Sequence, residues 1–273
     1  MKAELDSEKV EIYIDLHRQL KIPYKITLSN YTTRIKSEAY DLHFMKQEQS
    51  NRTFAAFAKC KKDCLKKPLP IIQKDKLKYF SHKFKEGNFY ADTIYNFDLK
   101  SAYAQILFND GYISKDTFIY LSRLPKLSRL AAVGMMASKK NIYEISEDGK
   151  ILSEEKIISP TSNYFFYCVQ RMAEIIKGAA DILGNGFLFS WVDGIYFNDC
   201  PETVKQDAKI IIEEYFKKIK TPVTFEILTE FEIQENEDYF KTTYRKEGKL
   251  KVINIAKEEN ICLHKITSYL LHR

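Results

Sequence analysis

The spacing of apolar and polar positions predicts several helices along the chain. Apolar residues recur every three or four positions in Ser7–Leu20, the pattern of an amphipathic helix capped by its first residue. Glu202–Lys218 has the same pattern. Ile113–Ala137 is also helical in pattern, and Pro125 within it must start a new helix or kink the first one. A further helix begins at Ser159-Pro160, a cap followed by an N-terminal proline, and ends where glycines follow.

Other segments have the pattern of strands. Tyr90–Phe97 is rich in β-forming residues and leads directly to Asp98. Asn141–Ile158 alternates around an Asp-Gly pair, which marks a hairpin turn. Phe187–Phe197 carries the strongest strand pattern and is interrupted at Asp193. It therefore predicts two short strands joined by a tight turn, with the aspartate at the tip.

These elements, with a last strand at Val223–Leu228, indicate an α+β protein in which helices cover one face of an antiparallel sheet. The composition agrees with a folded globular chain. Of 273 residues, 45% are hydrophobic and 29% charged, and the low total of 9 Gly and 7 Pro excludes disordered and fibrous classes. Every apolar run is shorter than the roughly 20 residues of a membrane helix, so we expect no membrane partner. The first residues, MKAELDSEKV, lack the apolar segment of a secretory signal, and we expect a cytoplasmic protein.

The five cysteines are scattered and odd in number, which suits reduced thiols. Cys60 and Cys64 form a single Cys-x3-Cys without a second ligand pair nearby. A zinc site is one interpretation. We favour the other, in which one turn of helix carries two structural thiols.

The positive charge is concentrated in one stretch. The whole chain has a net charge of +6, whereas Ala56–Lys85 holds ten lysines and two aspartates, a local net charge of +8. Aromatic residues lie among these lysines, a composition typical of a surface that follows phosphates and stacks on bases. A solvated basic face with aromatic residues turned into the core remains an equal alternative. The candidate nucleic-acid-binding lysines in this stretch are Lys61, Lys62, Lys66, Lys67, Lys83 and Lys85.

Two aspartates stand at predicted strand ends within apolar surroundings, Asp98 and Asp193. Each could simply cap a turn. Alternatively the two converge, because a pair of carboxylates on adjacent strand ends is what two Mg²⁺ ions need when they clamp a phosphoryl displacement.

The sequence around both aspartates resembles family B DNA polymerases. Asp98–Tyr103 reads Asp-Leu-Lys-Ser-Ala-Tyr and matches Asp, Ser and Tyr of motif A, Asp-x-x-Ser-Leu-Tyr-Pro. Phe189–Phe197 resembles motif C, Tyr-Gly-Asp-Thr-Asp-Ser, with Asp193 on the second, metal-binding aspartate. Trp191 replaces the first aspartate and Gly194 the serine, so the site would contain two carboxylates where many relatives have three.

Between these motifs, Lys126–Gly134 keeps the first and last positions of motif B, Lys-x3-Asn-Ser-x-Tyr-Gly, while Leu130 and Val133 replace its Asn and Tyr. The order of motifs also matches the palm of the family. After the last strand, a Lys-Thr-Thr-Tyr-Arg run loosely resembles a Lys-x-Tyr element that touches the primer, which adds Lys241 and Tyr244 as nucleic-acid-binding candidates. The residues before Asp98 contain no exonuclease motif, so the resemblance implies no proofreading.

The resemblance implies template-directed nucleotidyl transfer by a compact DNA polymerase or primase-polymerase of a phage or plasmid, acting in the host cytoplasm if viral. Asp98 and Asp193, with the carbonyl of Leu99, would hold Mg²⁺ or Mn²⁺. The expected partners are a DNA template-primer, deoxynucleoside triphosphates and other replication proteins. The residues expected to bind the nucleotide are Ser101, Tyr103, Lys126, Arg129 and, as an alternative cation, Arg123.

The resemblance also divides the chain into a basic N-terminal region (1–89), a palm-like core (90–112 and 138–235), a reduced fingers helix (113–137) and a C-terminal extension (236–273). Two other functions stay open. The first is a degenerate palm that binds nucleic acid or a replication protein without catalysis. The second is an unrelated α+β phosphotransferase or nuclease with paired aspartates.

Overall fold

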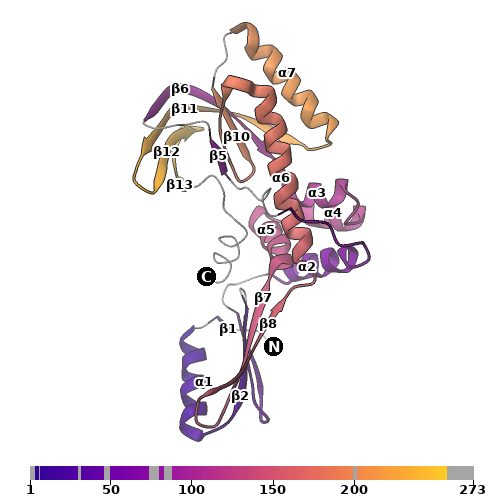
Figure 1. Cartoon of the computed structure of the whole chain (residues 1–273), viewed down its shortest axis with the longest axis vertical. Helices are drawn as coiled ribbons and strands as arrows, with labels where there is room; N and C mark the ends of the chain where they lie inside the picture. Colours follow the sequence, from indigo (N-terminus) through magenta and orange to yellow (C-terminus); the bar gives the residue numbers. More distant parts are fainter. Residues whose placement is uncertain are drawn as a thin grey trace. The chain divides into compact units, whose positions relative to one another are not determined.

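The chain contains two compact units, each with its own sheet. The computed structural model describes residues 4–5, 7–29, 32–45, 50–73, 80–82, 88–198 and 202–256. Within these residues, the first unit combines the chain up to Pro68 with Ile119–Phe165, and the second combines Leu69–Phe118 with the chain from Phe166 onward. The ribbon of each unit can be followed in Figure 1.

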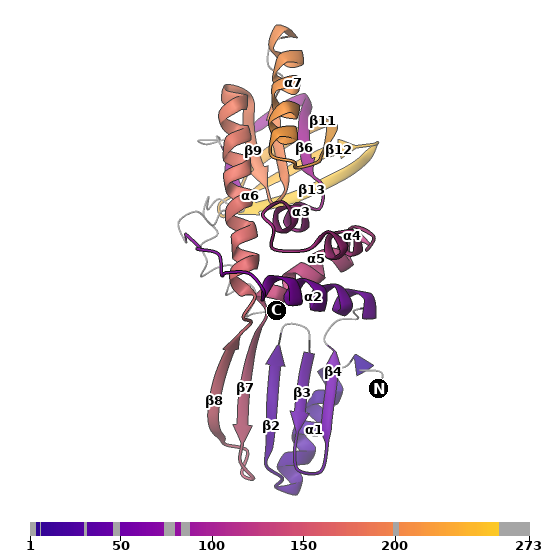
Figure 2. The ribbon, with the colours of Figure 1, turned by 90° about the vertical axis from the view of Figure 1, so that its right-hand side faces the viewer.

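The first unit is built on a six-stranded sheet with the order β1-β4-β3-β2-β7-β8. All its described pairs are antiparallel except the short β1–β4 pair. Helix α1 packs on one face of the sheet through Val10, Tyr13 and Ile14, which contact a core around Ile35 and Phe44 (Figure 2). The strands are β1 (Glu4–Leu5), β2 (Tyr24–Ser29), β3 (Thr32–Lys36), β4 (Asp41–Met45), β7 (Lys139–Ile145) and β8 (Ile151–Ile158), and α1 is Ser7–Leu20.

The first unit also contains a small helical layer. Helix α2 (Asn51–Cys64), capped by Ser50, packs against α5 (Lys126–Gly134), which leads into the 3-10 turn η2 (Met135–Ala137). The buried Tyr164 hydroxyl donates to the carbonyls of Cys64 and Lys67, both at 2.7 Å. This side chain closes the C-terminal end of α2, where main-chain carbonyls lack partners within the helix.

The second unit is built on a seven-stranded sheet with the order β13-β12-β11-β6-β10-β9-β5 and antiparallel pairing throughout its described strands. Helices α6 and α7 lie side by side against one face (Figures 1 and 2). The rings of Phe97 on β6 and Phe216 on α7 meet with centroids 5.7 Å apart. The elements are β5 (Phe80–His82), β6 (Phe89–Leu99), α3 (Ala102–Asn109), the 3-10 turn η3 (Gly184–Gly186), β9 (Phe187–Trp191), β10 (Gly194–Asn198), α7 (Glu202–Lys218), β11 (Val223–Glu235), β12 (Tyr239–Lys246) and β13 (Lys249–Ala256). Helices α4 (Lys115–Ser122) and α6 (Ser162–Leu183) each contain residues of both units.

The α+β class is confirmed, but the described residues form two sheets instead of the single sheet expected from the sequence. The hairpin of β7 and β8 pairs with β2 in the first sheet, although the sequence grouped it with the segments around Asp98 and Asp193. Strand β12 extends the second sheet, where the sequence predicted only a C-terminal extension. Helix α6 begins at Ser162, after the predicted start at Ser159. None of the described helices is long and apolar enough to cross a bilayer.

One close approach between α6 and α7 gives a test of this packing. A Cβ added at Gly178 on α6 would lie 2.9 Å from Cζ of Tyr215 on α7, whose hydroxyl donates to the Ile175 carbonyl at 3.0 Å. We expect Gly178→Ala to destabilise the protein by about 1–3 kcal/mol in chemical denaturation, because the Tyr215 ring must move.

The double variant Gly178→Ala/Tyr215→Ala is the control. With the ring removed, alanine at position 178 should be neutral or better than glycine relative to Tyr215→Ala alone, since alanine favours a helix interior by about 1 kcal/mol. Equal destabilisation in both backgrounds would contradict the packing described.

Candidate active site at the ends of β6 and β10

The backbone register of two neighbouring strands brings the predicted aspartates together. Asp98, near the end of β6, pairs directly with Gly194, the first residue of β10. The amide of Leu99 donates to the carbonyl of Asp193 at 2.9 Å. Both aspartates are half-buried. The predicted tight turn between β9 and β10 is therefore confirmed, and its tip lies beside the end of β6.

Both loops that carry the aspartates contain a residue in the left-handed backbone region. Val192, directly before Asp193, has φ of +53°, and Ser101, just after Leu99 and Lys100, also has φ of +53°. For a β-branched residue such as Val192 this conformation is an outlier that costs on the order of 1–3 kcal/mol. Such strain persists only where the surroundings impose it, and it is common at functional sites. Here the imposing contacts are the hydrogen bonds of Leu99 to Asp193 and of the Lys100 amide to the Pro222 carbonyl, each 2.9 Å.

A buried polar group that sequence reasoning missed lies on the same sheet face as Asp98. Strand alternation places Asn96 on that face, and its neighbour across the strands is Glu226 on β11. The Asn96 amide Nδ2 donates to Oε2 of Glu226 at 3.2 Å, and Lys246 on β12 forms an ion pair with Oε1 of the same carboxylate. The Glu226 side chain is only 15% exposed. The only sign of this polar group in the sequence was Glu226 itself, an acidic residue between the apolar Phe225 and Ile227.

Burial and the carboxylates of Asp98 and Glu226 both influence the titratable groups of this face. Burial acts against the charge of Lys246, but its hydrogen bond and ion pair with Glu226, together with the charge of Asp98, raise its pKa overall. Burial, with added contributions from Asp98 and Glu226, also raises the pKa of the Tyr196 and Tyr244 hydroxyls. Both tyrosines therefore stay protonated near neutral pH, and Lys246 stays charged.

Space around Gly194 is tight. A Cβ at this position would lie 3.0 Å from Cε2 of Tyr196 and 3.2 Å from Oδ1 of Asn96. That Oδ1 is buried and has no hydrogen-bond partner among the described residues. Its orientation follows from Glu226, which as a carboxylate accepts only and so selects the amide NH₂. A larger residue at position 194 would displace the side chains that lie beside Asp98.

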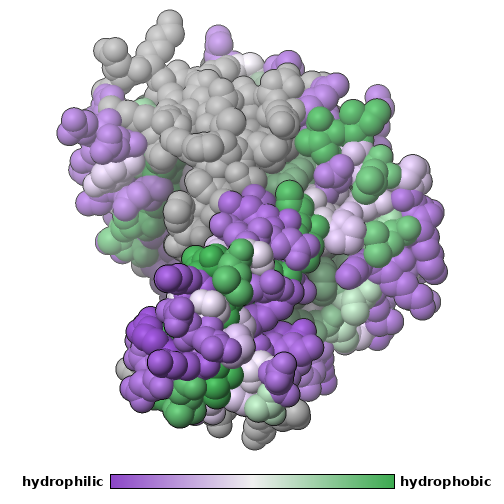
Figure 3. Space-filling model, turned by 60° about the horizontal axis from the view of Figure 1, so that its bottom comes forward, coloured by the Kyte–Doolittle hydropathy of each residue, from purple (hydrophilic) through white to green (hydrophobic). Residues whose placement is uncertain are grey.

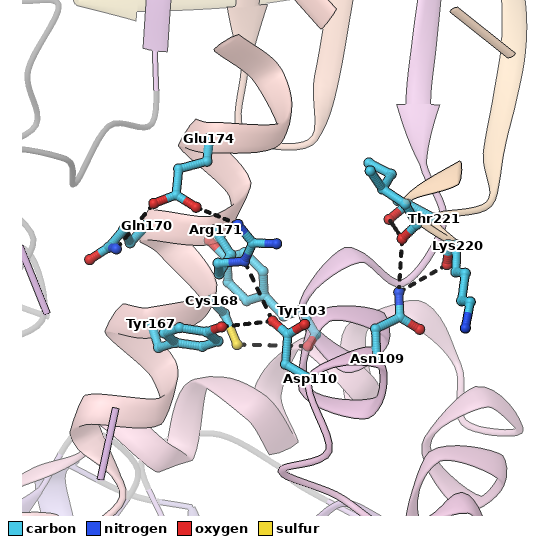
Figure 4. A network of polar contacts seen from close by, with 11 residues as sticks. Tyr103, Asn109, Asp110, Tyr167, Cys168, Gln170, Arg171, Glu174, Lys220 and Thr221 are labelled. Carbon is cyan, nitrogen blue, oxygen red and sulfur yellow. Dashed lines mark hydrogen bonds and ion pairs between the residues drawn. The ribbon is translucent and has the colours of Figure 1, made fainter. Parts of the chain in front are cut away.

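Helix α3, which follows the Asp98 loop and carries Tyr103, is anchored on two sides (Figure 4). On the side of α6, the Tyr167 hydroxyl donates to Asp110 at 2.8 Å, and the Cys168 thiol lies 3.7 Å from the Tyr103 carbonyl. On the other side, Asn109 donates to the carbonyls of Ile219 and Lys220 at 3.2 and 3.0 Å, in the turn before β11. Helix α3 is thus held near its start at Tyr103 and at its end at Asn109 and Asp110. Tyr103 is half-buried.

The three cations expected to bind a triphosphate belong to the first unit. Arg123 and Lys126 are exposed before and at the start of α5, and the guanidinium of Arg129 donates to the Leu124 carbonyl at 3.3 Å. Pro125 directly precedes α5. Of the two predicted outcomes, a new helix or a kink, the structure therefore shows a new helix. The structure groups these cations with one another, whereas Asp98 and Asp193 belong to the second unit.

The basic stretch begins on α2. Lys62, Lys66 and Lys67 are exposed at its C-terminal end and Lys61 is partly exposed, while Lys83 and Lys85 lie outside the described residues. Cys60 and Cys64 are buried in the same helix, as the helical interpretation predicted, and burial is the main cause that raises the pKa of each thiol to about 12. Both sulfurs are therefore protonated near neutral pH.

Lys241 and Tyr244 lie on opposite faces of β12, because residues three apart in a strand point in opposite directions. Tyr244 faces the site, with its ring centroid 6.4 Å from that of Tyr196. Lys246, two residues further on, is the cation on that face. Within the described residues, no three His, Cys, Asp or Glu side chains gather into a metal-binding group.

Comparison with protein-family models gives no match for the chain, and comparison with curated proteins gives none either.

The buried ion pair beside Asp98 can be tested by a double-variant cycle. Lys246→Met should cost about 1–3 kcal/mol in denaturant unfolding, because it leaves the Glu226 carboxylate in a largely buried position without its cation. Adding Glu226→Gln to this variant should recover most of the loss. If the two substitutions are simply additive, the pair is not coupled and the polar group described is wrong.

Proposed function

We propose that the chain is a template-directed nucleotidyltransferase, a compact DNA polymerase or primase-polymerase similar to family B, with the second unit acting as its palm. The observation that carries this proposal is the pairing of Asp98 with Gly194, which joins the two predicted aspartates at adjacent strand ends. These are the positions that match the metal-binding aspartates of motifs A and C. The antiparallel sheet with two helices on one face agrees with a palm, which the resemblance implied.

The donor atoms at this site fit Mg²⁺ or Mn²⁺. Mg²⁺ prefers oxygen ligands and commonly takes one or two carboxylates together with phosphates and water. Asp98, Asp193 and the main-chain carbonyl of Leu99 are donors of this kind, and the triphosphate would complete the ligand set. When bound, the metal would activate the primer 3′-hydroxyl and stabilise the leaving pyrophosphate.

Residues of the same face would hold the substrates in place. Lys246 remains protonated beside Asp98 and offers a positive charge for a phosphate of the primer strand, the role that the sequence assigned to Lys241. Tyr103 and Ser101 follow Asp98 on an anchored loop and helix, so their positions relative to the metal-binding carboxylate would be fixed. In this role the Tyr103 ring would lie against the sugar of the incoming nucleotide.

Other parts of the proposal depend on the resemblance alone. These are the contacts of Lys126, Arg129 or Arg123 with the triphosphate, the binding of template-primer DNA by the lysines of α2, and the involvement of other replication proteins. The exposure of Lys62, Lys66 and Lys67 is compatible with binding to a DNA backbone.

A second candidate function, a palm that binds nucleic acid without catalysis, is favoured by the altered motifs. Trp191 stands in place of the first motif C aspartate. Val133, in place of the motif B tyrosine, is only 2% exposed and so presents no side chain to a nucleotide. An unrelated phosphotransferase or nuclease would use the same two carboxylates on a different substrate.

Extension of a primed template separates these functions. With Mg²⁺ or Mn²⁺ we expect incorporation, and Asp98→Asn or Asp193→Asn should each reduce it by at least about 10³-fold, since metal-held charge stabilisation contributes several kcal/mol. Unprimed, DNA-primed and RNA-primed templates are tested in parallel.

Asp92→Asn is the matched control, because Asp92 is an exposed carboxylate on the same strand, β6. It should leave extension unchanged, and circular dichroism should show that all three variants fold. Absence of incorporation on every template would favour the binding module. Undiminished extension by Asp98→Asn would refute the proposed site.

A further inference from the structure

Among the described residues, no strand pairs with the long outer edge of the first unit's sheet. Strand β8 pairs with β7 on one side only, and all eight of its residues are exposed. The opposite edge of the sheet, β1, is two residues long. Edge strands in natural proteins are usually short, interrupted by proline or lined with lysines, because unpaired backbone groups otherwise invite another strand.

Strand β8 is only partly protected: three charged residues lie at its centre, and a β-bulge at Leu152 interrupts its pairing with β7. It reads Ile-Leu-Ser-Glu-Glu-Lys-Ile-Ile, with a single lysine and no proline. Its ends expose large apolar side chains, with exposed fractions of 63% for Ile151, 68% for Leu152 and 59% for Ile158. In Figure 3, apolar side chains reach the surface among hydrophilic ones in several places. By contrast, β13, an edge of the second sheet, carries Lys249 and Lys251.

The sequence of β8 is complementary to itself. In an antiparallel pair centred on Glu155, Glu154 of one copy faces Lys156 of the other, and the same contact occurs twice by symmetry. Leu152 is the extra residue of the β-bulge, so regular alternation is taken only from Ser153 to Ile158. Cross-strand pairs of opposite charge and of apolar side chains each stabilise a sheet by about 0.2–1 kcal/mol.

The neighbouring registers are worse. A shift that centres the pair on Glu154 places this glutamate against itself. A centre at Lys156 places two lysines together and Glu154 against Ile158. A centre between two residues would bring together side chains from opposite faces of the sheet. Centring on Glu155 leaves one unfavourable contact, the two Glu155 side chains at the symmetry axis.

We propose that β8 is a self-association surface, at which two copies of this chain join their sheets edge to edge about a two-fold axis. Such an isologous contact uses the same strand from both copies and closes without further growth. The first sheets of the two copies then form one continuous sheet. This interface is independent of the function proposed for Asp98 and Asp193.

The test is a charge exchange followed by sedimentation equilibrium of the full chain. Glu154→Lys alone would create two lysine pairs, and Lys156→Glu alone would create two glutamate pairs. Each single variant should weaken the dimer by about tenfold or more. The double variant Glu154→Lys/Lys156→Glu restores both opposite-charge pairs and should restore the dimer.

Two further variants complete the test. Glu155→Gln removes the repulsion at the axis and should strengthen the dimer. Glu38→Lys, an exposed site in the β3–β4 turn of the same unit, makes the same change of charge away from β8 and should leave it unchanged. Circular dichroism of the double variant should show that the exchanged charges are compatible with folding.

Three results would overturn the proposal. The first is a wild-type chain that remains monomeric at all concentrations up to about the 10⁻⁴ M range of weak complexes. The second is a dimer that none of the β8 substitutions affects. The third is a double variant that remains as weak as the single ones.

Discussion

The antiparallel pairing of β6 with β10 is the constraint on which the candidate site depends. Asp98 and Asp193 are separated by more than ninety positions in the sequence, and only the register of Asp98 with Gly194 and the hydrogen bond from Leu99 to Asp193 bring them together. A slip of one residue would turn Asp98 to the opposite face, among the aromatic side chains that pack against α7. Within this pairing, Val192 in the β9–β10 turn adopts a strained, left-handed backbone conformation.

The sheet face around Asp98 combines polar residues with an aromatic core. Tyr196 stacks on Phe189 with centroids 4.2 Å apart, and beside this stack Asn96, Glu226 and Lys246 form a connected polar group. Groups of this kind are costly to bury unless they are paired. This buried charged group lies beside the two strand ends. Its position fits a role in the proposed phosphate chemistry.

Sequence patterns predicted the local elements well and the long-range pairing poorly. Ser7–Leu20 and Glu202–Lys218 are helices with the predicted bounds, because an amphipathic period is a local property. The pairing of β7 with β2 joins segments more than a hundred residues apart, and no periodicity encodes it. The role of Glu226 could not be predicted from the sequence for the same reason, because only the register of β11 with β6 places it beside Asn96. Lys241 and Tyr244 were expected to bind nucleic acid as one short run, and the two-residue period of a strand places them on opposite faces of β12.

Binding of Mn²⁺ in the presence of a nucleoside triphosphate tests the central claim most directly, because it requires neither a primer nor the correct template. Isothermal titration of the wild-type chain should show metal binding that depends on the nucleotide. This binding should be lost in both Asp98→Asn and Asp193→Asn and retained in Asp92→Asn. Unchanged binding in either of the first two variants would contradict the account that the β6–β10 register builds a shared metal site.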